Sequence, residues 1–203
     1  MFRSTKSFRP RLATWSMVFL LVFLAGCADL YQARGSRVVL PSENASIAVV
    51  PFENLTNHQG AGVVCAEMTQ SELAARGRFR MVSQGKVRRI METMDVKDPD
   101  RIKMTQAEAI GEAVHADLVV VGNVSEYGYQ YGLREEPSVT LSLRLVRLSD
   151  GAVLWHASAG QVGRGTFSRE SVSLVAMTLI RKMVSAMLRG QDIAILDDSG
   201  AGT

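Results

Sequence analysis

The chain has 203 residues, with 23 Lys and Arg against 20 Asp and Glu, three His and two Cys. Four of the basic residues (Arg3, Lys6, Arg9 and Arg11) precede an N-terminal apolar run, and together they have the pattern of a secretory signal. Removing that signal leaves 19 basic against 20 acidic side chains, a net charge of −1, so no nucleic-acid partner is expected.

The signal ends in the stretch Leu24–Cys27, which reads Leu-Ala-Gly-Cys. The apolar run before it, Trp15–Leu24, is far shorter than the ~20 residues that a membrane-spanning helix needs. The stretch resembles the lipobox of bacterial lipoproteins, which implies cleavage before Cys27 and a covalent lipid, thioether-linked diacylglycerol plus palmitate, on that residue. The alternative is an ordinary signal with a chance cysteine. Because Ala28 rather than Asp follows Cys27, outer-membrane sorting with the domain in the periplasm is favoured.

Four segments follow from this pattern: a signal (1–26), a lipid-anchored tether (27–45), a globular domain (46–190) and a mostly loose tail (191–203). The tether is polar and shows no sustained hydrophobic period. Eighteen extended residues reach at most about 60 Å, so the domain should sit near its membrane. The domain is long enough to bury a core without disulfides.

The first half of the domain alternates strands and helices. Ser46–Phe52 is a continuous apolar run, typical of a strand buried on both faces. Ala61–Arg76 is predicted as a helix that stops at Gly77. A short strand (Phe79–Ser83), an amphipathic helix (Lys86–Met94) and a helix started by a capping box at Thr105–Glu108 and ending at His115 follow in order.

The second half predicts three strands and a closing helix. Leu118–Tyr131 begins as a buried strand, and Val139–Leu145 alternates apolar and polar residues as a half-buried antiparallel strand does. A tight Asp-Gly turn leads into a strand with Trp155 in its core. The final helix runs to Arg189, and its buried stripe is Val172, Ala176, Leu179, Met183 and Met187.

The predicted order is therefore β-α-β-α-α-β-β-β-α in a single domain. This order favours the α/β class, in its α+β form with helices covering a mixed sheet.

Four stretches resemble the CsgG-like group of periplasmic lipoproteins over about residues 46–188. They are Ile47–Asn54, Gly77–Val82, Ala116–Gly122 and Asp150–Trp155. The group contains secretion channels, LpoB-like activators of penicillin-binding proteins and PelC-like exopolysaccharide lipoproteins. The resemblance implies the fold and an envelope-assembly role, and it assigns no catalytic residue.

Departures from the family pattern narrow the role. No spare pair of alternating strands remains for a transmembrane barrel, which argues against a self-made pore. The short tether is awkward for an LpoB-like activator, whose long linker carries the domain away from the outer membrane. A PelC-like, short-tethered domain in a membrane-proximal ring fits best.

The sequence contains no catalytic or metal-binding pattern. His58, His115 and His156 are scattered, and no HExxH, CxxC or GxSxG motif occurs. The glycine-rich stretch Gly160–Thr166 lacks the ending of a phosphate loop and is interpreted as a flexible turn. Cys65 lies among apolar residues and is predicted to be a buried, inert thiol. We therefore expect no enzyme activity, no metal and no cofactor beyond the covalent lipid.

Three tyrosines, Tyr127, Tyr129 and Tyr131, fall on alternate positions and should share one face of a strand. With Arg134 in the following turn, they are candidates for a contact with a subunit or partner, because the tyrosine ring is apolar and its hydroxyl polar. Packing in the core is the equally weighted alternative.

The sequence thus predicts a non-enzymatic, outer-membrane-anchored lipoprotein. It would self-associate or bind an envelope protein to support export of a polymer such as an exopolysaccharide, with possible polysaccharide contact. The alternative is an LpoB-like activator of a peptidoglycan synthase.

Overall fold

A computed structural model describes residues 32–35, 44–131, 135–163 and 170–189. They form one mixed sheet in the order β1-β7-β6-β5-β2-β4, with β3 beside β5. The strands are β1 (Gln32–Gly35), β2 (Ser46–Val49), β3 (Glu53–Asn54), β4 (Arg80–Met81), β5 (Leu118–Tyr131), β6 (Glu135–Arg147) and β7 (Ala152–Val162). The helices are α2 (Ala61–Ala75), α3 (Gln84–Thr93), α4 (Met104–Ala113) and α5 (Val172–Arg189), with a 3-10 turn η1 (Pro99–Arg101).

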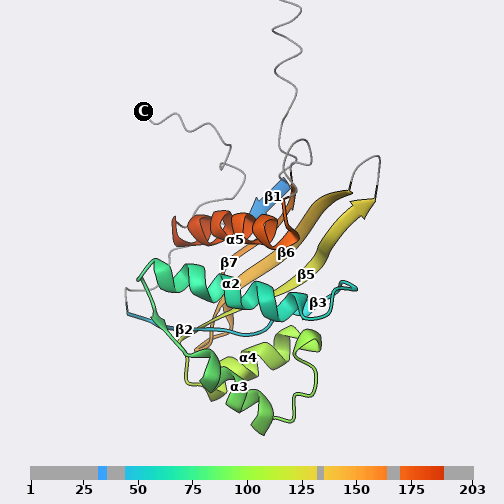
Figure 1. Cartoon of the computed structure of the whole chain (residues 1–203). Coiled ribbons are helices and arrows are strands. Elements are labelled where there is room, and N and C mark those ends of the chain that lie inside the picture. The colour runs from blue at the N-terminus through green and yellow to red at the C-terminus, as the bar shows by residue number, and fades with distance from the viewer. Residues whose placement is uncertain (1–31, 36–43, 132–134, 164–169, 190–203) are drawn as a thin grey trace, which may run out of the picture. The chain divides into compact units, whose positions relative to one another are not determined.

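Helices cover the sheet on both faces (Figure 1). Strand β2 pairs in parallel with β4 and β5, so it is central and buried on both sides, as its apolar run predicts. Ile47 and Val49 enter the core with α2 and α5, whereas Ala48 and Val50 enter a second core with α3 and α4.

Strands β5, β6 and β7 form an antiparallel meander, whose β5–β6 arm extends past the helices at the upper right of Figure 1. A bulge at Ser125 interrupts the β5 register between Val124 and Glu126. Because one extra residue reverses which side chains face each side, even-numbered residues enter the α5-side core before the bulge and odd-numbered ones after it. Val124 and Tyr127 therefore both lie in that core.

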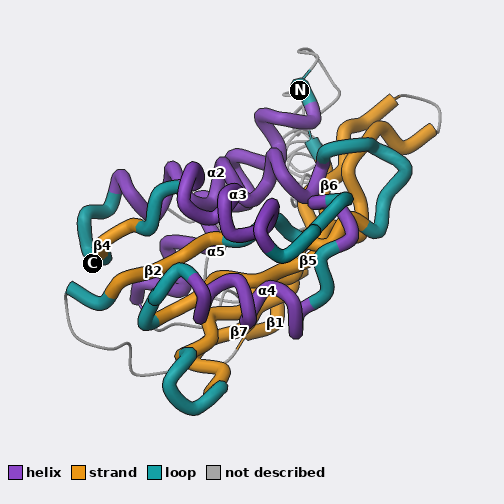
Figure 2. The backbone as a smooth tube through the Cα atoms, turned by 90° about the horizontal axis from the view of Figure 1, so that it is seen from below, coloured by secondary structure: helices purple, strands orange, loops and turns teal. Residues whose placement is uncertain are grey.

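The helices α2 and α5 lie side by side on one face (Figure 1). The guanidinium of Arg76 donates to the hydroxyl of Ser185 at 2.8 Å, and the guanidinium of Arg181 lies 3.8 Å from the carboxylate of Glu72. Successive turns at the end of α2 therefore lie beside successive turns of α5. The predicted apolar stripe of α5, five residues from Val172 to Met187, is buried. Figure 2 shows the same backbone from below, coloured by secondary structure, with the helices overlapping the strands in this view.

The predicted class and element order are confirmed, with two additions and one correction. Strand β1 lies inside the segment expected to be tether and pairs with β7, and β3 is a short extra pairing beside β5. Helix α4 begins at Met104, because Gln106 rather than Glu108 accepts from the backbone of the N-cap, Lys103. The helix ends at Ala113, two residues before the predicted end, and His115 just beyond the C-cap has a φ of 55° that cannot continue a helix.

Candidate functional site

The three-tyrosine strip divides into a buried part and an exposed part. The Tyr127 ring is 8% exposed and lies against His58, with the ring centroids 4.9 Å apart. Its hydroxyl is 3.2 Å from the hydroxyl of Ser173 on α5. Tyr129, two residues on, is 47% exposed. Tyr127 is therefore held by the domain's own contacts, while Tyr129 is available to a partner.

The remaining members of the predicted strip lie at the edge of the described residues or outside them. Tyr131 pairs with Glu135 through the backbone, and only its main chain is described. Arg134 lies outside the described residues, as does Cys27, the expected lipidation site. The contact role of the strip stays a prediction.

The opposite face of the β5–β6–β7 arm is polar. Apolar residues on this face stop at Val121 and Val146, where α4 ends its cover. Beyond them the face carries Ser142 and Ser158, whose hydroxyls are 2.7 Å apart across β6 and β7. Sequence alternation predicted polar residues here, but did not show that α4 reaches this face only as far as Ser142 and Arg144.

Glu126 is the charged centre of this polar face. Its carboxylate accepts from Gln130 at 2.6 Å and from Thr140 at 3.1 Å. Burial alone would raise the pKa of Glu126, but the hydrogen bonds from Gln130, Ser138 and Thr140 outweigh it and hold the pKa below its ordinary value. The group is thus a fixed anion at working pH rather than a proton carrier.

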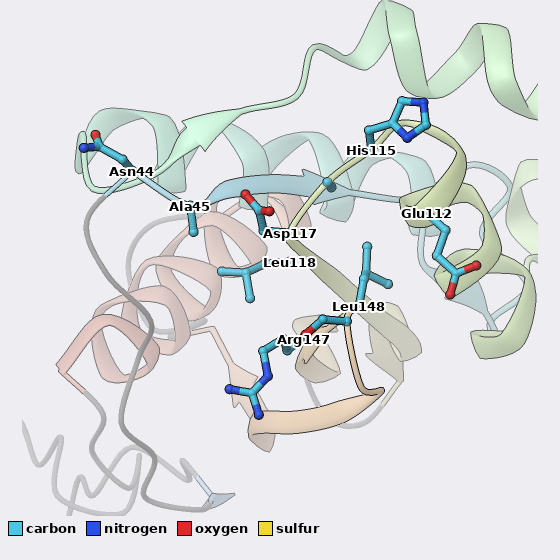
Figure 3. A pocket seen from close by; sticks show the side chains of 10 residues that line it. Asn44, Ala45, Glu112, His115, Asp117, Leu118, Arg147 and Leu148 are labelled. Atoms are coloured by element: carbon cyan, nitrogen blue, oxygen red, sulfur yellow. The ribbon is translucent and has the colours of Figure 1, made fainter.

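A second feature is an open pocket of about 740 Å³ at the other end of the strands (Figure 3). Glu112, His115, Asp117 and Arg147 lie around it, from α4, the α4–β5 turn and β6. Asp117 has a structural role, because the backbone N–H and the hydroxyl of Ser46 both donate hydrogen bonds to its carboxylate at 2.7 Å.

The electrostatics of this pocket indicate structure rather than catalysis. The hydroxyl of Ser46, with help from its backbone N–H and from Arg80, lowers the pKa of Asp117. Arg147 is held by Asp150 through two hydrogen bonds of 2.9 and 2.7 Å. Ser149 is the one hydroxyl residue in this pocket's described lining.

The histidines and the thiol occupy separate environments. His58 lies in the loop before α2, His115 follows α4, and His156 lies on β7. Within the described part of the chain, no group of three or more His, Cys, Asp or Glu could hold a metal ion. Cys65 is fully buried, as predicted, and burial raises its pKa to about 12, which favours an unreactive thiol. Among the described helices, none has both the length and the apolarity to cross a membrane.

Comparison with known proteins identifies a family and a fold. The family described as GNA1162-like lipoproteins matches residues 38–199. A PelC dodecamer from Paraburkholderia phytofirmans is similar with a TM-score of 0.59 and 25% identity, covering 77% of this chain and 96% of that one. Lipoprotein GNA1162 from Neisseria meningitidis is similar with a TM-score of 0.55 and 25% identity, covering 71% and 96%. No match was found among curated proteins.

These likenesses confirm the mixed α/β single domain and the expected similarity to PelC. They concern nearly the whole of each solved chain, so the likeness is not confined to one motif. The wider CsgG-like grouping stays a prediction.

Proposed function

Because this chain belongs to the GNA1162-like lipoprotein family, we propose that it is acylated at Cys27 and acts as a non-enzymatic accessory protein at the periplasmic face of the outer membrane. It self-associates there and supports export of an envelope polymer such as an exopolysaccharide. The family match supports the proposal that the protein is a lipoprotein, and the lipobox residue Cys27 is the expected site of lipid attachment.

The likeness to a PelC dodecamer supports self-association. The domain also exposes large apolar side chains beside each other on the α2–α5 pair. Leu174 is 48% exposed and Met177 43%, one turn apart on α5. Val64, 38% exposed, lies on the aligned turn of α2. Exposed apolar groups gathered in this way favour a protein contact.

An activator role on a peptidoglycan synthase is the alternative from the sequence. Strand β1 counts against it, since pairing with β7 shortens the free tether further. A domain on so short a tether reaches little distance into the periplasm.

Two measurements on the mature protein test the proposal. Mass spectrometry should find Cys27 as the first residue with acyl mass, and Cys27→Ala should leave the signal uncleaved. In detergent, the acylated protein should have the mass of an oligomer. Deletion of the gene should reduce exported polymer without changing peptidoglycan synthesis. A monomeric mass with normal polymer export would contradict the assembly role, and a loss of peptidoglycan synthesis would favour the activator.

A further inference from the structure

The position of β1 determines which end of the domain can face a membrane. The globular chain enters the sheet at Ser46, which pairs with Arg80, and Ile47 pairs with Leu118. Leu118 pairs in turn with Arg147, so Ser46 lies at the same end of the sheet as the start of β7. We call this the turn end. A free tether attached at Ser46 would bring the turn end to the bilayer.

Strand β1 is attached near the other end. Gln32 pairs with Gly160, two residues before the end of β7, and Gly35 pairs with Ala157. The last residue pair of the β5–β6 arm, Tyr131 with Glu135, lies farther in the same direction. We call this the hairpin end. The chain therefore meets the sheet at the hairpin end before it reaches Ser46.

The distance from the lipid to β1 is short. Cys27 and Gln32 are five residues apart, so they are separated by at most about 18 Å of extended chain. Eight residues of β7 separate Gly160 from Ala152 at the turn end, a length of about 27 Å at ~3.4 Å per residue. The chain from Cys27 to Gln32 is too short to span that length. While β1 is paired, the domain therefore cannot stand upright on the bilayer with its turn end toward the lipid.

The hairpin end, in contrast, lies within reach. Val162 pairs with Ser138, and the β5–β6 arm continues three residues past Ser138 to Glu135. Counted from Gly160, the arm extends about five residues, or about 17 Å. The length of the arm beyond Gly160 therefore matches the maximum length of the chain from Cys27 to Gln32.

We propose that β1 acts as a clip that fixes the domain with its hairpin end toward the lipid surface and its turn end, with the Asp117 pocket, toward the periplasm. The proposal rests on the acylation of Cys27 proposed above. Its partner is the bilayer surface itself. The β1–β7 pairing is what fixes the orientation. Without it, the domain would be joined to the lipid by 19 free residues from Cys27 to Ser46, which permit either orientation.

The test places one fluorophore at each end of the acylated, full-length mature protein. Gln130→Cys labels the hairpin end and Ser149→Cys the turn end, and both positions are exposed. Cys65 does not compete for the label, because it is buried with a pKa of about 12. The protein is reconstituted in phosphatidylethanolamine–phosphatidylglycerol vesicles that carry a headgroup-labelled acceptor lipid, and energy transfer is measured after flotation.

Transfer should be severalfold higher from position 130 than from position 149. In the double variant Ala33→Pro/Arg34→Pro, the prolines remove backbone donors of β1, so the difference should shrink by half or more. The matched variant Ala33→Val keeps the donors and should retain it. Equal or reversed transfer in the otherwise unchanged protein would overturn the orientation, as would a difference that survives the prolines. Failure to float with vesicles would instead overturn the acylation and, with it, the orientation.

Discussion

The two faces of the β5–β6–β7 meander are made by the same strands and have opposite environments. On one face, Leu143, Leu145 and Trp155 are buried under α2 and α5. On the other, Ser142, Arg144 and His156 alternate with them, and Arg144 reaches the sulfur of Met104 at the start of α4, at 2.7 Å. None of these three side chains is buried. The comparison separates stability from function: substitutions on the covered face should unfold the domain, and those on the uncovered face should leave it folded.

The largest expected effects come from changes to the covered face, and the first of these changes is overfilling. Gly62 of α2 lies against the backbone of the segment that joins β2 to β3, and a Cβ there would overlap the carbonyl oxygen of Phe52. Because backbone cannot move aside cheaply, Gly62→Ala should cost at least the ~1–3 kcal/mol of ordinary overpacking, and the gain in helix propensity should not offset it. Chemical denaturation measures the loss.

Gly85→Ala is the matched control for that substitution. Gly85 lies in α3, and a Cβ there meets no atom within 4 Å. The substitution Gly85→Ala should therefore stabilise the domain by about 0.5–1 kcal/mol through helix propensity. Equal effects of the two substitutions would show that α2 does not pack against the backbone of Phe52.

Truncating a side chain on the covered face should be at least as damaging. Trp155 is fully buried, as its sequence context predicted, so Trp155→Ala should cost about 3–5 kcal/mol. Val153 lies on the same strand but is 46% exposed on the other side, and Val153→Ala should cost under about 1 kcal/mol. Thermal melting of the pair measures how unequal the two faces are. Similar losses would contradict the assignment of the faces.

The tyrosines test where the covered face ends. Tyr127→Ser removes a buried ring and its contact with Ser173, so it should lower the melting temperature by several degrees. Tyr129→Ser should change melting little, because Tyr129 is half exposed. If Tyr129 is a subunit contact, its substitution should lower the oligomer mass in detergent. An unchanged mass would remove Tyr129 from the interface.

The sequence predicted the covered face well and the uncovered one only in part. The apolar run of β2, the stripe of α5 and the burial of Trp155 depend on hydrophobic patterns that one chain displays directly. The bulge at Ser125 and the pairing of β1 depend on long-range register, for which no local pattern exists. The tyrosine strip could therefore be assigned to one face, but not divided into a buried and an exposed member.

The smallest expected effect concerns the turn end, where Asp117 joins β2 to β5. Its pKa is lowered chiefly by the hydroxyl of Ser46, so between the folded and unfolded pKa values the unfolded chain binds more protons. The resulting stability is present above the unfolded value, near pH 4, and is lost as pH falls through the folded value. Because Asp117 is exposed to water, the contribution should stay below about 1 kcal/mol.

Asp117→Asn should flatten the decline in unfolding free energy below pH 4, measured by urea titration at several pH values. Ser46→Ala should do so in part, because the backbone N–H of residue 46 still donates to the carboxylate. Asp150→Asn is the matched control, since the pKa of Asp150 is lowered by Arg147 at the same end of the molecule. Each substitution should remove only its own share of the slope, because the two carboxylates have separate partners. If Asp117→Asn left the slope intact while Asp150→Asn abolished it, the link between Ser46 and Asp117 would not stabilise this end of the sheet.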